Sequence, residues 1–332
     1  MKNIAFFDSK PYDKVWFEKL QDKYDIKIRF FEEKLAPDTA FMSGGFDGVV
    51  AFVNDTINSE VIETLYKNGI NIIAMRCAGY NNIDLASAYG KVHIARVPVY
   101  SPYAVAEHAT ALLLTLNRKI HRAYIRTRDN NFNIDGLTGF DLHGKTVGVI
   151  GTGKIGQAFI NICKGFGTEV IAFDPYPDKS LDVEYTELAD LFGRSDIISL
   201  HCPLTNDTHG IINEKSIGMM KDGVYIINTS RGPLINSEDL LEAIKSKKVG
   251  AAGLDVYDEE SDLFFKDLSG KIINDDTLAR LISMPNVIVT SHQAFLTNEA
   301  LRSIAEVTLE NLYEYFNKAT MKNEICLNRS KA

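Results

Sequence analysis

The sequence predicts an α/β protein built from two doubly wound parallel sheets. Two series of short apolar runs alternate with stretches of helical period, one before residue 100 and one after Lys145. The runs are continuously apolar rather than alternating, which is typical of parallel strands covered by helices on both faces. The length of 332 residues also exceeds what one average core organises. We therefore expect two domains.

The first series supplies five expected strands and is followed by a long helix. Ser101 and Pro102 suit the N-cap and the first position of that helix, and apolar side chains recur on one of its faces from Val105 to Leu116. Because the helix separates the two series, we place a domain boundary near its start. The expected strands are NIAFFD (3–8), IKIRFFE (26–32), GVVAFV (48–53), NIIAMRC (71–77) and HIARVPV (93–99).

The second series supplies six further strands and precedes a final helix. Apolar residues recur at helical spacing over residues 297–318. We expect this helix to return to the first domain, so that residues 1–100 plus 298–332 form one domain, interrupted by residues 101–297. The expected strands are TVGVIG (146–151), EVIAFD (169–174), IISLHC (197–202), VYIINTS (224–230), AAGLDVY (251–257) and NVIVTSH (286–292).

Composition excludes several classes of function. The net charge is −8 and the basic residues are interspersed with acidic ones, so no basic stripe is offered to a nucleic acid. The start, MKNIAFFDSK, has only four consecutive apolar residues before Asp8 and lacks the pattern of a secretory signal. The most apolar helical stretch still carries Glu107 and His108, so no membrane span is predicted. We expect a cytoplasmic protein.

The cysteines form no recognisable ligand pattern. They lie far apart and contain no C-x-x-C pair, which argues against a disulfide framework and against a zinc site. We interpret them as small buried apolar residues and predict no metal. The four are Cys77, Cys163, Cys202 and Cys326.

The strongest local motif is GTGKIG at residues 151–156, directly after an expected strand and directly before an expected helix. In a Rossmann-like unit, Gly151 permits the tight turn, Gly153 lets the backbone approach a pyrophosphate, and Gly156 lets the helix pack close to the sheet. The first helical turn then faces the phosphate charge. The context predicts dinucleotide binding, although a glycine turn that merely connects strand and helix is the alternative.

The acidic end of the next strand predicts which dinucleotide binds. Asp174 lies 18 residues beyond Gly156, where a carboxylate accepts hydrogen bonds from ribose hydroxyls and repels a 2′-phosphate. We therefore expect NAD rather than NADP, unless Asp174 is an ordinary loop acid. Lys154, inside the turn, is either a phosphate contact or a solvated charge.

Chemically active side chains follow several strands of the second series. Ligands of doubly wound sheets bind beyond the carboxyl ends of the strands, where Arg231, Asp255, Glu260 and His292 are expected. Reduction of a 2-keto acid needs a cation for the carboxylate, a proton donor for the carbonyl oxygen and a group that keeps the donor protonated. Arg231, His292 and Glu260 suit these roles in that order, and Asp255 would orient neighbouring groups or the nicotinamide ribose.

Each of these residues also has an ordinary structural interpretation. His292 alone could be a packing or surface histidine, and Glu260 lies in the acidic run DEESD, which is typical of a solvated face. Arg231 precedes Gly232 and Pro233 and could be a turn residue. Only their joint placement at strand ends favours catalysis.

Together the motifs resemble the D-specific 2-hydroxyacid dehydrogenases over nearly the whole length, and most of all the fermentative, D-lactate-forming members of that family. The segments that carry the resemblance are RCAGYNNIDL (76–85), VPVYSPYAVAEHA (97–109), GTGKIG (151–156), NTSRGPLIN (228–236), GLDVYDEE (253–260) and SHQAF (291–295).

The resemblance implies an Arg, Glu, His catalytic set, which falls on Arg231, Glu260 and His292. It also implies that backbone amides around Ala78 and Gly79 hold the substrate carboxylate and that Tyr100 lines the site. Subunits of the family usually pair through their cofactor domains, which implies a homodimer or higher homo-oligomer. The residues that the resemblance places around NAD are Gly151, Gly153, Lys154, Ile155, Gly156, Asp174, Cys202, Pro203, Thr208, Thr229, Ser230, Arg231 and Asp255. One departure is Lys154, where the family often has His or Arg.

The expected reaction is reduction of pyruvate to D-lactate with NADH. By analogy Phe52 and Phe295 wall the side-chain pocket, although both could be core aromatics. A longer 2-keto acid, such as 2-oxoglutarate, 2-oxoisocaproate or phenylpyruvate, is the alternative substrate. A dicarboxylate would need a further cation, for which Arg76 and Arg96 are the available residues. A more distant alternative is a non-enzymatic NAD-sensing protein.

Overall fold

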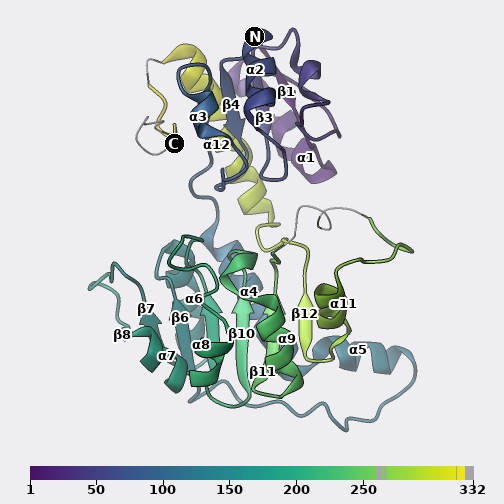
Figure 1. The fold of residues 1–332 in the computed structure, drawn as a ribbon, viewed down its shortest axis with the longest axis vertical. Helices are drawn as coiled ribbons and strands as arrows, with labels where there is room; N and C mark the ends of the chain where they lie inside the picture. Colours follow the sequence, from purple (N-terminus) through teal and green to yellow (C-terminus); the bar gives the residue numbers. More distant parts are fainter. Residues whose placement is uncertain (259–263, 265–266, 319, 326–332) are drawn as a thin grey trace. The chain divides into compact units, whose positions relative to one another are not determined.

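The computed structural model of the protein describes residues 1–258, 264, 267–318 and 320–325 (Figure 1). The chain divides into two compact units. Unit 1 contains residues 1–101 and 296–332, and unit 2 contains residues 102–295. Each unit holds its own parallel sheet, so the predicted α/β fold class is confirmed.

Unit 1 is a parallel sheet in the order β2-β1-β3-β4-β5. Every predicted strand of the first series is present, although each is shorter than its apolar run. Its strands are β1 (Lys2–Phe6), β2 (Ile26–Phe30), β3 (Gly48–Ala51), β4 (Ile72–Met75) and β5 (His93–Ala95). Its helices are α1 (Pro11–Leu20), η1 (Gln21–Tyr24), η2 (Ala40–Ser43), α2 (Ser59–Lys67), α3 (Leu85–Ala88) and α12 (Asn298–Asn317).

Both faces of this first sheet are buried, as continuously apolar strands require. One face packs against α2 and α3. The other face packs against α1 and α12, where Phe17 and Leu309 meet Ile4 of β1. The final helix therefore completes a core whose strands come from the opposite end of the chain, and Figure 1 shows it in yellow among the purple and blue elements of unit 1.

Unit 2 is a parallel sheet in the order β12-β11-β10-β9-β6-β7-β8. Its strands are β6 (Thr146–Ile150), β7 (Glu169–Phe173), β8 (Glu184–Tyr185), β9 (Ile197–Leu200), β10 (Val224–Asn228), β11 (Val249–Leu254) and β12 (Val287–Val289). Its helices are α4 (Pro102–Arg118), α5 (Ile120–Arg128), α6 (Lys154–Gly165), α7 (Leu188–Arg194), α8 (Glu214–Met219), η3 (Gly232–Leu234), α9 (Ser237–Lys245) and α11 (Asp276–Ser283).

Helices cover both faces of the second sheet as well. The apolar faces of α4 and α6 form one core layer with β6, β9 and β11, and α7, α8, α9 and α11 form the other. The sequence pattern did not predict the two-residue strand β8 or the separate helix α5, because neither carries a long apolar run.

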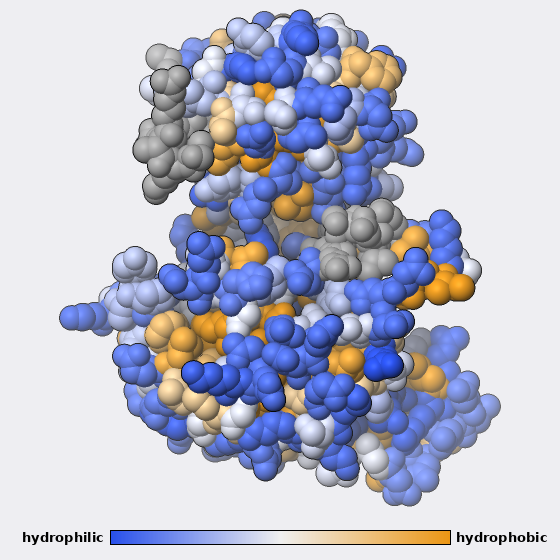
Figure 2. Space-filling model, in the orientation of Figure 1, coloured by the Kyte–Doolittle hydropathy of each residue, from blue (hydrophilic) through white to orange (hydrophobic). Residues whose placement is uncertain are grey.

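The surfaces of both units are mixed in character, and Figure 2 shows mostly polar residues with small apolar groups on the visible face. Within the described residues, no helix is both long and apolar enough to cross a membrane. Cys163 and Cys202 are buried and Cys77 is partly buried, and all three are free thiols. Cys326 lies outside the described residues.

Candidate active site

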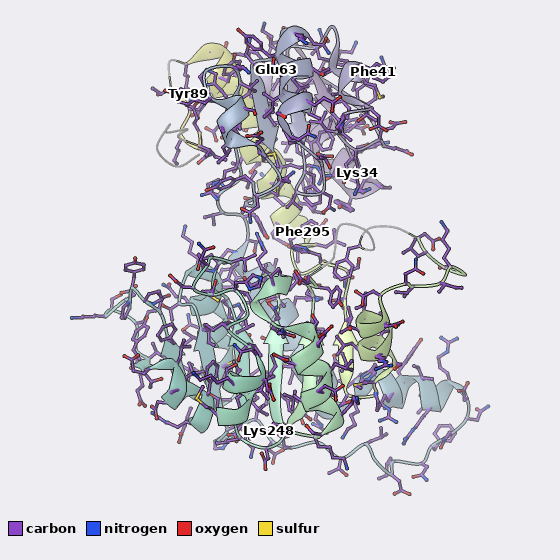
Figure 3. The ribbon with its side chains drawn as sticks, viewed as in Figure 1. Lys34, Phe41, Glu63, Tyr89, Lys248 and Phe295 are labelled. Atoms are coloured by element: carbon purple, nitrogen blue, oxygen red, sulfur yellow. The ribbon has the colours of Figure 1, made fainter. Side chains whose placement is uncertain are left out.

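The strand order of unit 2 brings the predicted site residues to one edge. Strands β6, β9, β10, β11 and β12 are consecutive neighbours and parallel, so their carboxyl ends meet at the same edge. Figure 3 labels Lys248, which precedes β11, and Phe295, which follows β12, at opposite edges of this sheet. The chemistry predicted from the sequence therefore gathers on the side of the unit away from Lys248.

The glycine turn after β6 has the geometry that its three glycines predict. Gly151 adopts a left-handed φ of 96°, and a Cβ built there would lie 2.6 Å from the backbone N of Cys202. A Cβ on Gly156 would lie 2.0 Å from the carbonyl oxygen of Gly151. Gly153 is the N-cap of α6, and a Cβ there would meet no atom within 4 Å. The turn is thus tight on its protein side and open on its outer side.

Asp174 supports this turn directly. Its Oδ2 accepts hydrogen bonds from the backbone N–H of Thr152 at 2.8 Å and from the Thr152 hydroxyl at 3.0 Å. Its Oδ1 accepts the backbone N–H of Tyr176 at 2.9 Å, and the Tyr185 hydroxyl donates to Thr152 Oγ1 at 3.0 Å. The sequence pattern predicted a ribose ligand, and the structure adds a structural role in which the carboxylate fixes the turn.

The ends of β9 and β10 are joined by a hydrogen bond between two predicted cofactor residues. The hydroxyl of Ser230 donates to the carbonyl oxygen of Cys202 at 2.7 Å. Asn228 shapes the turn after β10, because its side chain accepts from the N–H of Ser230 and donates to the carbonyl of Arg231. The guanidinium of Arg231 donates to the carbonyl of Ser230 at 2.7 Å, and the side chain is only partly buried.

The remaining predicted cofactor residues lie along the same edge. The Thr208 hydroxyl donates to the carbonyl oxygen of Pro203 at 2.7 Å, which closes the loop after β9. Lys154 is exposed and Ile155 partly buried in the first turn of α6. The side chain of Thr229 is buried, and its Oγ1 has no hydrogen-bond partner within the described residues.

His292 follows β12 on a turn with an unusual backbone. Its φ is 49°, a left-handed conformation that non-glycine residues adopt rarely, typically where the surroundings enforce it. The N–H of His292 donates to the carbonyl oxygen of Asp255 at 2.7 Å. Asp255 also accepts the N–H groups of Gln293 at 2.9 Å and Ala294 at 2.8 Å on its carboxylate. Asp255, which directly follows β11, therefore helps to fix the conformation of the turn that carries His292.

The Asp255 carboxylate is ionised although it has no exposed surface. Burial raises its pKa, but hydrogen bonds from His108, from Thr290 and from the two amides outweigh burial, so the net pKa lies below its usual range. Both carboxylate oxygens are thus engaged inside the protein. These contacts support the predicted role of Asp255 in orienting neighbouring groups, and its place around NAD stays a prediction.

Glu260, the third predicted catalytic residue, lies outside the described residues. Arg231 and His292 are placed at the ends of β10 and β12, which flank β11 on either side. The edge thus carries a cation, an imidazole and an open glycine turn within one sheet.

Comparison with known proteins identifies the family to which the chain belongs. The family model "D-isomer specific 2-hydroxyacid dehydrogenase, NAD binding domain" matches residues 110–294, which is more than half of the chain. The chain belongs to the D-isomer-specific 2-hydroxyacid dehydrogenase family. Its relatives include a D-lactate dehydrogenase of Escherichia coli, which is 49% identical over 326 residues that cover 97% of this chain and 99% of that protein.

Solved structures of the family match this dehydrogenase over its length. An apo-structure of D-lactate dehydrogenase from Escherichia coli has a TM-score of 0.90 and 47% identity, covering 98% of this chain and 100% of the other. A structure of D-lactate dehydrogenase with NAD⁺ from Lactobacillus jensenii has a TM-score of 0.83 and 30% identity, covering 98% of this chain and 99% of the other. The protein is therefore an NAD-dependent D-2-hydroxyacid dehydrogenase.

The residues of the dehydrogenase fit NAD at two independent points. The outer side of Gly153 is open, so backbone N–H groups at the start of α6 can approach a pyrophosphate. The buried hydroxyl of Thr229 directly follows β10, has no partner in the described part of the chain, and is available to a polar group of the cofactor.

The predicted substrate residues of the dehydrogenase are divided between the units. Phe52, Ala78, Gly79 and Tyr100 belong to unit 1, whereas Phe295 ends unit 2. Phe52 and Phe295 are both buried, and Tyr100 is partly buried. Ala78 and Gly79 lie in the loop after β4, at the carboxyl edge of the first sheet.

The loop that carries Phe52 is fixed by hydrogen bonds to the backbone N–H and the backbone carbonyl of Phe52. Its N–H donates to Asp55 Oδ2 at 2.6 Å, and its carbonyl accepts from the Asn82 side chain at 3.0 Å. The guanidinium of Arg76 covers the ring, 3.9 Å from its centroid. These contacts hold Phe52 firmly in its loop.

The sequence analysis assigned no role at the site to two histidines of unit 2, His108 and His201. His108 on α4 reaches Thr290 and Asp255, and the only available signal was its position in the family-like segment VPVYSPYAVAEHA. His201 ends β9, where burial lowers its pKa to about 3 and keeps the ring neutral, with Nε2 at 2.9 Å from Ser199 Oγ.

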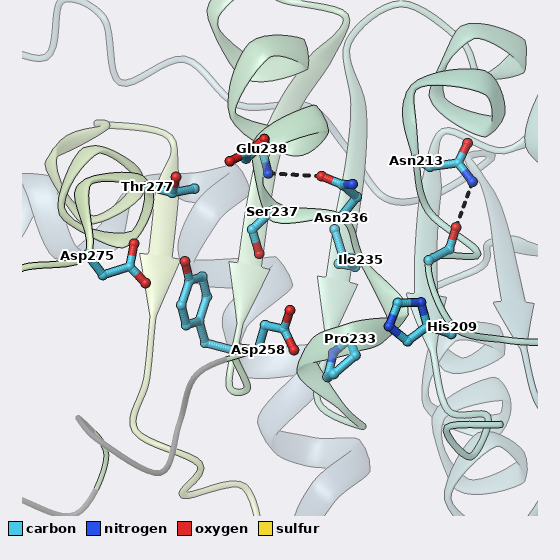
Figure 4. Close-up of a pocket in the computed structure, with 12 residues that line it drawn as sticks. His209, Asn213, Pro233, Ile235, Asn236, Ser237, Glu238, Asp258, Asp275 and Thr277 are labelled. Atoms are coloured by element: carbon cyan, nitrogen blue, oxygen red, sulfur yellow. Dashed lines mark hydrogen bonds between the residues drawn. The ribbon is translucent and has the colours of Figure 1, made fainter. Parts of the chain in front are cut away.

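A separate cavity of about 650 Å³ lies on unit 2 beside the ends of β10 and β11 (Figure 4). It is lined by Pro233, Tyr257 and the start of α9, and its carboxylates are Glu238, Asp258 and Asp275. Among the described residues that line it, none is a predicted cofactor or catalytic residue. An acidic lining also suits neither a pyrophosphate nor a keto acid.

Proposed function

We propose that the dehydrogenase reduces pyruvate to D-lactate with NADH in the cytoplasm, the fermentative reaction that the sequence predicts. The observation that carries the proposal is the shared edge of the second sheet, where Arg231, the His292 turn and the open glycine turn meet. Relatives named as D-lactate dehydrogenases, such as those of Escherichia coli and Curvularia clavata, support the choice of substrate.

The chain's own residues would perform three tasks. Arg231 binds the substrate carboxylate and polarises the keto group through its fork of donors. His292 donates the proton to the carbonyl oxygen as a general acid, and Glu260 keeps the imidazole protonated. Bound NADH supplies the hydride that adds to the keto carbon. The amides around Ala78 and Gly79 complete the binding of the carboxylate.

The cations of unit 1 support a monocarboxylic substrate. Arg76 is buried and pairs with Asp13 at 3.3 Å, so its charge is already balanced. Arg96 donates to the carbonyl oxygen of Ala78 at 2.9 Å and lies over the ring of Tyr80. Arg76 is thus engaged within the protein and Arg96 already binds the loop that carries Ala78, which favours pyruvate over 2-oxoglutarate.

The proton-donor role is tested by replacing His292 with alanine. We expect NADH-dependent pyruvate reduction to fall by about 10²–10⁴-fold, the usual contribution of general acid–base catalysis. NADH affinity should stay close to that of the original protein, because no contact of the glycine turn is changed. Stopped-flow turnover and fluorescence titration with NADH measure the two quantities. Unchanged turnover would contradict the role, and a preference for 2-oxoisocaproate in a kcat/KM panel would contradict pyruvate.

Replacement of Asp174 with alanine tests the selection of NAD. We expect the ratio of kcat/KM for NADPH to that for NADH to rise, because the charge that repels a 2′-phosphate is removed. Since Asp174 also fixes the turn through Thr152, Thr152→Val is the matched control. It removes the hydroxyl contact but retains the charge, so both cofactors should be affected alike. An unchanged ratio in Asp174→Ala would count against the assignment.

We also propose that two copies of the chain pair through the arm formed by α5 and residues 129–141. Five large apolar side chains of this arm are more than half exposed: Ile120, Tyr124, Ile125, Phe132 and Ile134. Arg126 holds the arm by donating to the carbonyls of Asn133 and Asp135. Such a patch on one surface is typical of an interface.

The pairing is tested with the double replacement Phe132→Asp and Ile134→Asp. Burying two carboxylates in an apolar interface is unfavourable, so light scattering after size exclusion should show the mass of a monomer. Ile272→Asp is the control, because Ile272 is exposed but is not part of this arm. A dimer that survives the double replacement would locate the interface elsewhere.

A further inference from the structure

His108 connects α4 to the turn that carries His292. Its Nε2 lies 3.1 Å from the Thr290 hydroxyl oxygen and 3.3 Å from Asp255 Oδ1. The neighbouring residues Ala109 and Leu112 are buried in the core of unit 2, so the backbone that carries His108 is firmly fixed. The imidazole is therefore a rigid contact of the His292 turn, although it lies 182 residues from Thr290 in the sequence.

The hydrogen-bond partners determine which nitrogen carries the hydrogen. The Thr290 hydroxyl donates its hydrogen to Asp255 Oδ1 at 2.6 Å, and an ionised carboxylate can only accept. Neither partner has a hydrogen to offer to His108. Nε2 must therefore be protonated and must donate to this pair of oxygens.

The donation from His108 completes the set of bonds around the Asp255 carboxylate. Oδ1 accepts from Thr290 and from the amide of Gln293, and Oδ2 accepts from the amide of Ala294. These amides belong to the residues that follow His292, whose own N–H binds the Asp255 carbonyl. Without a donor at position 108, Asp255 is a buried carboxylate with weaker stabilisation of its charge, and its hold on the turn loosens.

We propose that His108 is a positioning residue for His292, acting through Thr290 and Asp255 to hold the left-handed turn in the conformation that catalysis requires. His108 touches neither substrate nor cofactor in this role. The inference rests on the proposed function of His292 as the proton donor.

The variants are chosen to separate the donor from the size of the side chain. His108→Gln keeps an N–H group that can replace the Nε2 donor, whereas His108→Met removes it and retains much of the volume. His143→Met is the matched control, because His143 is exposed and precedes β6 at the opposite edge of the sheet.

In His108→Met, we expect kcat for pyruvate reduction to fall about 10- to 100-fold, which corresponds to the loss of one hydrogen bond to a charged group. The Kd of NADH should change less than about twofold, because the glycine turn is untouched. His108→Gln should restore kcat to near the original value, and His143→Met should leave it unchanged. Unaltered kcat in His108→Met, or equal losses in the Met and Gln variants, would overturn the proposal.

Hydrogen exchange provides a readout that does not depend on turnover. The amides of Gln293 and Ala294 donate to Asp255, so the peptide that covers residues 290–295 should exchange faster in His108→Met and normally in His108→Gln. Faster exchange throughout unit 2 would indicate general destabilisation and would refute positioning. If the original protein reduces no 2-keto acid, the proposed function fails, whereas this measurement still decides whether His108 holds the turn.

Discussion

Replacing Gly156 with alanine is expected to abolish measurable NADH binding and to destabilise unit 2. The new Cβ would lie 2.0 Å from the carbonyl oxygen of Gly151, which is backbone and cannot rotate away. The first turn of α6 would have to move from the sheet, and the N–H groups that face the pyrophosphate would move with it. Fluorescence titration with NADH and thermal unfolding by circular dichroism measure the two effects.

Two other glycines of the same segment provide graded controls. A Cβ at Gly153 meets no atom within 4 Å, so Gly153→Ala should keep the apo stability within about 0.5 kcal/mol and still weaken NADH binding by obstructing the cofactor. A Cβ at Gly165, the last residue of α6, also meets nothing. Gly165→Ala should leave NADH binding unchanged. Normal NADH affinity in Gly156→Ala would refute the close-packing argument.

Replacing Arg76 with methionine is expected to destabilise unit 1 by about 3–5 kcal/mol, the usual cost of leaving a buried charge without its partner. The guanidinium is 2% exposed and neutralises Asp13. Burial already raises the pKa of Asp13 despite the opposing effect of Arg76. Without Arg76 that pKa rises further above its unfolded value, so the loss of stability should be small near pH 4 and grow as pH rises.

The single tryptophan makes this effect measurable in one unit. Trp16 lies on α1 of unit 1, so its fluorescence during urea unfolding reports on unit 1 alone. Adding Asp13→Asn to Arg76→Met should recover much of the stability. Arg29→Met is the control, because Arg29 also covers a phenylalanine ring but is exposed. Equal effects of the Arg29 and Arg76 replacements would contradict the charge argument.

The sequence predicted the sheets well because apolar runs and glycines act locally. Gly151, Gly153 and Gly156 could be assigned separate roles before any contact was known, since each role follows from the strand and helix on either side. The same local reasoning placed Arg231 and His292 at strand ends on one edge of the second sheet.

Other parts of the site depend on contacts that no local pattern encodes. Asp255 was expected to orient neighbouring groups, but no local pattern indicates that its carboxylate binds the amides of Gln293 and Ala294 in the loop after β12. His108 contributes from a helix far away in sequence, and its role depends on the hydroxyl of Thr290. Asp174 is predicted from its position to bind the cofactor, but its hydrogen bonds to Thr152 within the glycine turn could not be read from the sequence.

The return of α12 to the first sheet has a consequence for synthesis on the ribosome. Unit 2 is continuous in sequence and can fold as it emerges. The face of the first sheet that receives Ala305 and Leu309 must wait for α12, so Ile4 and Phe17 stay partly uncovered until α12 has been synthesised. The nascent chain therefore carries an apolar surface until α12 emerges, and chaperones that recognise such surfaces would meet this protein at its first sheet.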